Sequence, residues 1–104
     1  MGRLGDLEER TLFAVIEARH QHLPADATQI AHIISASGQY TEPNKIYPTV
    51  LRLEGKGLLQ SRMQPTFTQP RRVRRLYTPT ELGLEIALLK KRQLQTLSAH
   101  VSTS

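Results

Sequence analysis

The sequence predicts a mainly α-helical domain with one small β-hairpin, in the order α-α-α-β-β-α. Apolar residues recur at the three-and-four spacing of a buried helix face in the first half of the chain and again near its end. Between these regions, residues 58–64 and 72–79 lose that period and contain Val, Leu and Tyr, of which Val and Tyr favour strands. The length of 104 residues fits one domain with a modest core.

Two helices are expected before residue 40. The first covers residues 7–22, is capped at or near Asp6 and ends at the turn around Pro24. The second covers residues 28–36 and ends at Gly38. Each helix has one apolar stripe that faces the core: Leu7, Leu12, Phe13, Val15 and Ile16 in the first, and Ile30, Ile33 and Ile34 in the second.

The third helix is expected over residues 44–56, with Gly57 after it. Two strands joined by a proline-flanked loop follow, and Thr80 caps the last helix. The inward stripe of the third helix is Ile46, Val50 and Leu53. This order of elements describes a winged helix-turn-helix, in which the third helix can enter a major groove of DNA while the hairpin reaches the backbone or minor groove beside it.

Positive charge is concentrated in these same two elements. Residues 45–75 contain eight Lys/Arg against one Glu, a net charge of +7. The rest of the chain contains six Lys/Arg against eight Asp/Glu, a net charge of −2. Charge that is segregated in this way indicates a polyanionic partner, and double-stranded DNA is the leading one.

Two motifs resemble those of a known family. The segments Ile46-Tyr47-Pro48, Leu51-Arg52-Leu53-Glu54 and Gly57-Leu58-Leu59 together resemble the recognition-helix signature of PadR-like transcriptional regulators. The segments Arg74-Arg75-Leu76-Tyr77 and Thr80-Glu81-Leu82-Gly83 resemble the second signature of that family, on the wing and at the start of the C-terminal helix.

The resemblance spans about residues 7–89 and implies a dimeric DNA-binding regulator. Residues 42–45 depart from the family pattern, because a small-residue turn usually stands there. Many members have a long C-terminal domain that dimerises and binds effectors, whereas this chain has one helix after the wing. It therefore resembles the compact branch, which includes the cyanobacterial clock-associated Pex proteins, and no small-molecule effector is expected.

The wing supplies the densest group of candidate DNA contacts, four arginines whose mutual repulsion phosphates would relieve: Arg71, Arg72, Arg74 and Arg75. Narrow minor grooves also attract inserted arginine. The alternative is a solvated edge strand whose charge prevents aggregation. Strand alternation places Arg72 and Arg74 on one face and Arg75 on the other, with Tyr77. Phe67, in the loop between the strands, is either a wedge or partner contact or an ordinary loop aromatic.

The third helix supplies a second group on an outward face, at spacings of four, three and four: Lys45, Thr49, Arg52 and Lys56. Lys45 and Thr49 are expected at base edges, and Arg52 and Lys56 at phosphates or in a salt bridge. The alternative is an ordinary polar face. Tyr47 and Tyr77 either contact phosphate or pack between helix and sheet, and the resemblance favours a mixed role for Tyr47.

The last helix has more apolar surface than a small core requires. It either caps the core or forms a homodimer interface, for which the candidates are Leu82, Ile86, Leu89, Leu94 and Leu97. A two-fold dimer would present two third helices to half-sites about 34 Å apart.

Other kinds of site lack the residues they need. The sequence has no Cys, its four His have no supporting carboxylates, and it shows no phosphate loop or nucleophile motif, so neither a metal or other cofactor nor an enzyme is expected. No segment resembles a signal peptide or membrane span, so a cytoplasmic, nucleoid-associated protein is expected.

The predicted protein is thus a homodimeric DNA-binding regulator. Residues 1–80 form the winged helix-turn-helix, residues 81–98 the dimerisation helix and residues 99–104 a flexible tail. We expect a repressor that occludes an inverted-repeat operator, which the Pex resemblance would place at a clock gene. A protein–protein module, or a binder of RNA or a replication origin, remains the alternative.

Overall fold

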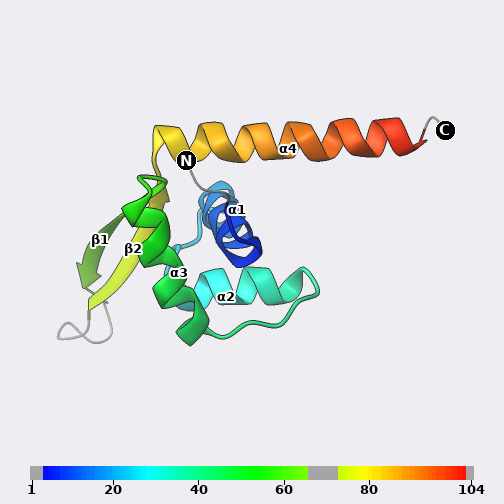
Figure 1. Ribbon diagram of the computed structural model, residues 1–104. Coiled ribbons are helices and arrows are strands. Elements are labelled where there is room, and N and C mark those ends of the chain that lie inside the picture. The colour runs from blue at the N-terminus through cyan, green and yellow to red at the C-terminus, as the bar shows by residue number, and fades with distance from the viewer. Residues whose placement is uncertain (1–3, 66–72, 103–104) are drawn as a thin grey trace.

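Among the described residues of the computed structural model, four helices and one antiparallel hairpin occur in the predicted order, so the predicted fold class is confirmed (Figure 1). The structure describes residues 4–65 and 73–102, with side chains for 4–65 and 74–93. The elements are α1 (Asp6–His20), α2 (Ala27–Ala36), α3 (Pro43–Gly55), β1 (Leu59–Pro65), β2 (Val73–Pro79) and α4 (Glu81–Ser102).

Local hydrogen bonds fix where the helices begin. The N–H of Gly5 donates to Glu8 Oε1 (3.3 Å), so α1 is capped one residue before the expected Asp6. The Asp26 carboxylate accepts from the N–H of Gln29 (2.8 Å) at the start of α2. Thr80 Oγ1 accepts from the N–H of Gly83 (3.0 Å), which confirms the predicted cap of α4. Short polar residues are common just before a helix, because their side chains accept hydrogen bonds from the backbone N–H groups of the first turn, which have no partner within the helix.

Two helices end in the same way but with different residues. After α3, Gly57 takes a left-handed conformation (φ 76°) and the N–H of Leu58 donates to Leu53 O (2.9 Å). After α1, His22 takes the left-handed position (φ 56°), and the N–H of Leu23 donates to the carbonyl of Ala18 (2.8 Å). This turn ends α1 at His20, two residues earlier than predicted. Glycine adopts the conformation without strain, whereas histidine does not.

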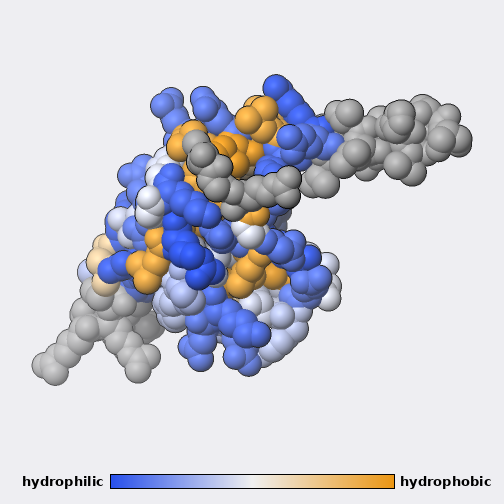
Figure 2. All heavy atoms as spheres, in the orientation of Figure 1, coloured by the Kyte–Doolittle hydropathy of each residue, from blue (hydrophilic) through white to orange (hydrophobic). Residues whose placement is uncertain are grey.

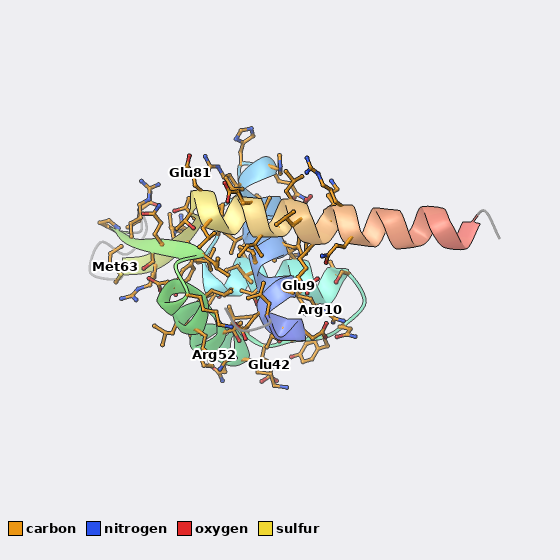
Figure 3. The ribbon with its side chains drawn as sticks, turned by 45° about the horizontal axis from the view of Figure 1, so that its top comes forward. Glu9, Arg10, Glu42, Arg52, Met63 and Glu81 are labelled. Atoms are coloured by element: carbon orange, nitrogen blue, oxygen red, sulfur yellow. The ribbon has the colours of Figure 1, made fainter. Side chains whose placement is uncertain are left out.

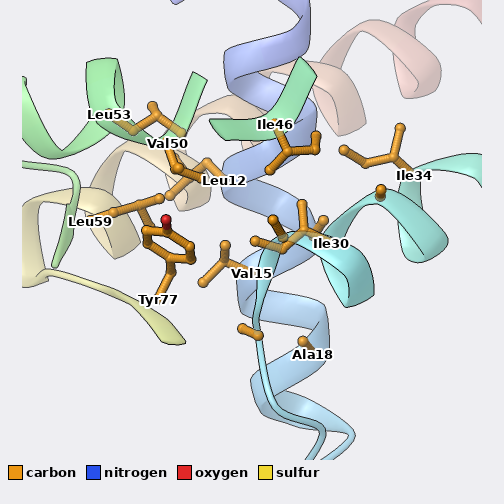
Figure 4. Packing of buried hydrophobic residues seen from close by; sticks show 14 of the residues in the cluster. Leu12, Val15, Ala18, Ile30, Ile34, Ile46, Val50, Leu53, Leu59 and Tyr77 are labelled. Atoms are coloured by element: carbon orange, nitrogen blue, oxygen red, sulfur yellow. The ribbon is translucent and has the colours of Figure 1, made fainter. Parts of the chain in front are cut away.

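The core lies where α1, α2, α3 and the base of the hairpin meet (Figure 4). Its fully buried large side chains are Leu12, Val15, Ile30, Ile46, Val50, Leu53 and Leu58. Four predicted core residues, Leu7, Phe13, Ile16 and Ile33, are only partly buried and pack at its margin. The core is therefore complete on the α3 side and open on the side of α1 and α2 that faces α4.

α4 approaches the body closely at its first turns and then leaves it. Gly83 permits the approach, because a Cβ at this position would lie 2.2 Å from the carbonyl oxygen of Leu58. Ala87, one turn later, is also buried. The helix continues to Ser102, past residue 98 where a flexible tail was predicted, because no Gly or Pro follows Gly83. Figure 1 shows its distal half projecting beyond the other elements. Within the described residues, no helix is both long and apolar enough to span a membrane.

Candidate nucleic-acid interface

α3 has two opposite faces. The buried face follows the i, i+3, i+4, i+7 pattern of Ile46, Thr49, Val50 and Leu53, all 0% exposed. The exposed face has its apex on the other side of the helix, at Asn44, Pro48 and Leu51. Leu51 is 60% exposed, which is unusual for a leucine in a small domain. The outward surface of α3 is therefore uncharged at its centre.

The structure corrects the prediction for Thr49. Its side chain is fully buried, and its hydroxyl donates to the carbonyl oxygen of Lys45 one turn earlier (2.9 Å). It cannot reach a base edge from this position. Adding the i+3 position to the stripe of Ile46, Val50 and Leu53 would have placed Thr49 inside.

The apex residues Asn44 and Leu51 were not among the predicted contacts. Both lie opposite the buried stripe on a helical wheel, and this angle is the signal that identifies them. An asparagine amide can pair with adenine, and an apolar side chain can contact the methyl group of thymine. The midline of the exposed face of α3 thus has the chemistry needed to read base edges in a major groove.

Three cationic residues lie along one flank of α3, and they are not equally free. Lys45 and Arg52 are exposed, and Figure 3 shows Arg52 pointing away from the body. Lys56 Nζ instead donates to Glu8 Oε2 on α1 at 2.6 Å. Of the two predicted roles for Lys56, phosphate contact or a salt bridge, the structure shows the salt bridge. Lys45 and Arg52 form the exposed cationic edge of α3.

Glu8 is a buried carboxylate that ties α1 to α3. The hydrogen bond from Lys56 lowers its pKa below the ordinary 4.5; burial opposes this shift, and the N–H of Gly5 and the positive charges of Lys56 and Arg52 reinforce it. The sequence could not show this contact, because Glu8 and Lys56 are 48 positions apart. Glu8 sets the position of the C-terminal end of α3 and neutralises part of its charge.

The two tyrosines separate into different roles. Tyr77 is buried in the core, and its burial raises the pKa of the phenol. Tyr47 is 52% exposed on α3. Tyr77 therefore packs in the core, as one of the two predicted alternatives had it, whereas Tyr47 is exposed and free to contact a partner.

The two described arginines of the wing lie on opposite faces of β2. Arg75 is exposed and pairs in register with Met63 of β1, which is also exposed. Arg74 is half-buried, with Nη1 3.8 Å from Asp26 Oδ2 on the α1–α2 connection. The hydroxyl of Ser61, beside Tyr77 in the ladder, donates to Glu54 of α3 at 3.0 Å. This contact places the Arg75 face of the hairpin toward α3. Arg71, Arg72 and Phe67 lie outside the residues whose side chains the structure describes.

Some of the predicted dimer residues are exposed on α4, and others are not. Leu82 and Leu89 are 36% and 56% exposed, whereas Ile86 packs against the core of its own chain. The side chains of Leu94 and Leu97 lie outside the described part. Two further leucines, Leu84 and Leu88, are 43% and 50% exposed. Figure 2 shows hydrophobic side chains gathered along the proximal part of α4.

Beside these leucines lies an apolar groove of about 720 Å³ between α1, α2 and α4. The half-buried Phe13, Ile16 and Ile33 form one side of it, and Leu84 and Leu88 form the other. Across residues 4–65 and 74–93, no cluster of three or more His, Cys, Asp or Glu is arranged to bind a metal ion.

The structure is similar to solved structures of PadR family proteins. It matches a PadR family transcriptional regulator from Eggerthella lenta DSM 2243 at 24% identity and a TM-score of 0.64, covering 91% of this chain and 82% of that one. A PadR family regulator from Clostridium difficile R20291 matches at 15% identity and a TM-score of 0.74, covering 95% and 97%. Bacillus subtilis PadR, solved in complex with operator DNA, matches at 14% identity and a TM-score of 0.69, covering 98% of this chain and 62% of that protein.

No family model matches the sequence, and no curated protein sequence matches it. The likeness therefore rests on the backbone, and it agrees with the geometry of α3, the hairpin and α4 described above. The chain has the winged helix-turn-helix fold of PadR family transcriptional regulators.

Proposed function

We propose that this protein is a sequence-specific, double-stranded DNA-binding transcriptional regulator. The observation that carries the proposal is the outward face of α3. Asn44 and Leu51 form its uncharged apex, and Lys45 and Arg52 lie along its flank. In a major groove, the apex would meet base edges while the flank meets the phosphates beside the groove.

The wing extends this surface. Arg75 lies on the face of the hairpin that is turned toward α3, so it would reach the backbone or minor groove adjacent to the helix. Arg74 would contribute less, because it is half-buried beside Asp26. We expect Arg71 and Arg72 to add to the wing contacts. The likeness to a PadR protein that was solved with operator DNA supports DNA as the partner.

The protein would act as a homodimer through α4. Its exposed leucines and the adjoining apolar groove present a larger apolar surface than a soluble monomer usually leaves open. A second copy is the occupant that suits both, because a two-fold interface pairs the same helix and groove from each chain. A dimer would present two α3 helices and therefore favours an inverted repeat. Repression would follow from occlusion of a promoter, at a clock gene if the likeness extends to Pex proteins.

Selection from pooled random duplexes at about 150 mM salt tests the proposal, because non-specific binding is weak at physiological salt. Purified protein should enrich a palindrome whose half-sites lie about one helical turn apart. Arg52→Gln protein should enrich the same palindrome with lower yield, because it no longer neutralises a phosphate but keeps the apex. If no sequence is enriched and binding disappears with rising salt, the protein is not a sequence-specific regulator.

A further inference from the structure

A second group of cationic side chains lies across the hairpin from α3. Arg19 at the end of α1, Arg62 on β1 and Arg74 on β2 line a pocket of about 390 Å³, together with His22. Its remaining wall is mainly apolar and includes Leu23, Pro24 and Leu76. One helix and two strands thus bring positive charge to one shallow, solvent-open pocket.

The strand register separates this pocket from the proposed DNA surface. Arg62 follows Ser61, whose hydroxyl bonds to Glu54 of α3, so Arg62 projects from the opposite face of the ribbon. Arg62 pairs with Leu76, and Arg74 is two residues from Leu76 on the same strand. The two arginines are therefore diagonal neighbours, a relation that places side chains about 7–8 Å apart.

The positive charge in the pocket is incompletely balanced. Within the part of the chain that the structure describes, Asp26 is the one carboxylate in an ion pair with a pocket arginine, at 3.8 Å from Arg74, and its other oxygen caps α2. Among the described residues, neither Arg19 nor Arg62 forms an ion pair. Three guanidinium groups against one carboxylate leave a net charge of +2. Arg74 Nε is also buried without a hydrogen-bond partner, which folded proteins seldom allow.

The backbone next to the pocket holds a further unusual feature. His22 lines it in a left-handed conformation (φ 56°), at the position where the end of α3 has Gly57. Such a conformation is less favourable for a histidine than for a glycine, because the histidine has a Cβ. Strained residues of this kind gather at binding sites, where the side chain has a use that offsets the strain.

From these observations we infer that the pocket binds a small phosphorylated molecule. Guanidinium groups bind phosphate oxygens through paired, charge-assisted hydrogen bonds, and three of them suit a diphosphate better than a single carboxylate. The apolar wall of Leu23, Pro24 and Leu76 would hold an organic group attached to it. Arg19, Arg62 and His22 are outside the proposed DNA contacts, and Arg74 is the one residue that the pocket shares with them, as a minor contact. The inference does not depend on the proposed function.

The pocket lies between the hairpin and the α1–α2 connection, so a ligand bound there would contact both. The N–H of Tyr77 in β2 donates to the carbonyl oxygen of Ala25 (3.0 Å), so the hairpin is already attached to the α1–α2 connection beside the pocket. A phosphate held by Arg19 on one side and by Arg62 and Arg74 on the other would strengthen this attachment. The ligand would thereby fix the angle at which the wing leaves the body.

Calorimetric titration of the full chain with inorganic pyrophosphate, at low ionic strength and without DNA, tests the inference. We expect one pyrophosphate per chain, and an affinity at least about tenfold lower in the double variant Arg19→Gln/Arg62→Gln. Both side chains are exposed, so the variant should keep the fold, which circular dichroism can verify. The matched control is Arg52→Gln/Arg75→Gln, which removes the same charge from the DNA face and should bind pyrophosphate as the natural chain does.

Two outcomes would overturn the inference. If both double variants lose pyrophosphate to the same degree, the anion is attracted by net charge and no site exists. If the natural chain binds no pyrophosphate while Arg19→Gln/Arg62→Gln loses affinity for duplex DNA, the pocket belongs to the DNA surface. Failure of DNA binding by the natural chain would leave the pyrophosphate result unchanged, so the two proposals are tested separately.

Discussion

At the scale of single residues, what a side chain does is decided by which neighbour it meets. Lys45 and Lys56 have the same charge on one flank of α3, yet only Lys56 has Glu8 within reach. The sequence places both on that flank but not the carboxylate beside one of them. Thr49 is different, because its buried position follows from the helical period alone. Contacts between distant segments are therefore the part that sequence could not supply.

The ion pair of Glu8 predicts a specific dependence of stability on pH. The folded-state pKa of Glu8 is lowered, so the carboxylate stabilises the fold above its unfolded pKa, and this stability is lost as pH falls through the folded pKa. Glu8→Gln should therefore be less stable than the natural chain at pH 7, and the difference should shrink at about pH 3. Urea unfolding at both values measures it; a difference that is the same at both would contradict the assignment.

The left-handed conformation of His22 gives a second prediction. His22→Gly should raise the free energy of unfolding by about 0.5–1 kcal/mol, because glycine adopts this conformation without strain but loses more freedom on folding. His22→Ala keeps the strain and serves as the control. Equal stabilities of the glycine and alanine variants in urea would show that the turn is not strained.

At the scale of elements, the sequence predicted the order correctly and most boundaries to within two residues, because periodicity, capping residues and Gly57 are local signals. It placed the end of α4 too early, since the frayed tail was assumed without a residue that stops a helix. The close contact of α4 was also invisible in the sequence, because Gly83 matters only through Leu58 of another segment.

That contact is tested by Gly83→Ala. The added Cβ would fall 2.2 Å from a backbone oxygen, so α4 must shift away from the body, and the free energy of unfolding should fall by about 1–3 kcal/mol. Gly55→Ala is the matched control, because nothing lies within 4 Å of a Cβ there. Thermal or urea unfolding measures the stability of both variants. Equal stabilities would mean that α4 does not pack against Leu58 at Gly83.

The hairpin offers a comparison of adjacent arginines. Arg75→Ala should weaken binding to all duplexes and reduce the slope of log affinity against log salt by about 0.9 for each phosphate that the protein no longer neutralises. Arg74→Ala removes the same charge from the half-buried side and should have a smaller effect on DNA binding. Fluorescence anisotropy at several salt concentrations measures both. Equal effects of the two substitutions would contradict the assignment of the two faces.

At the scale of the whole molecule, the leucines of α4 were recognised in the sequence as a surplus of apolar surface, but the groove beside them was not. The stripes of α1 and α2 predicted Phe13, Ile16 and Ile33 as core residues, and only the path of α4 shows that they border open space. The sequence could thus indicate surplus apolar surface on α4, while the groove beside it could be found only from the fold.

Charged substitutions in this groove test the dimer. Leu84→Glu/Leu88→Glu should yield monomers in analytical ultracentrifugation and lower the affinity for a two-half-site duplex, while binding to a single half-site persists. The comparison is Met63→Glu on the hairpin, which is similarly exposed and should leave the oligomeric state unchanged. Monomers in both the natural chain and the variants would rule out dimerisation by α4.

If the apex of α3 reads bases while its flank contacts phosphates, substitutions at the two places should change DNA binding in different ways. The affinities of Asn44→Ala, Leu51→Ala and Lys45→Gln would be measured on the selected duplex and on a scrambled duplex of equal length. The apex variants should lose about 1–3 kcal/mol of discrimination between the two duplexes with little change on the scrambled one. Lys45→Gln should lose affinity for both equally. Full discrimination by Asn44→Ala and Leu51→Ala would show that the apex does not read bases.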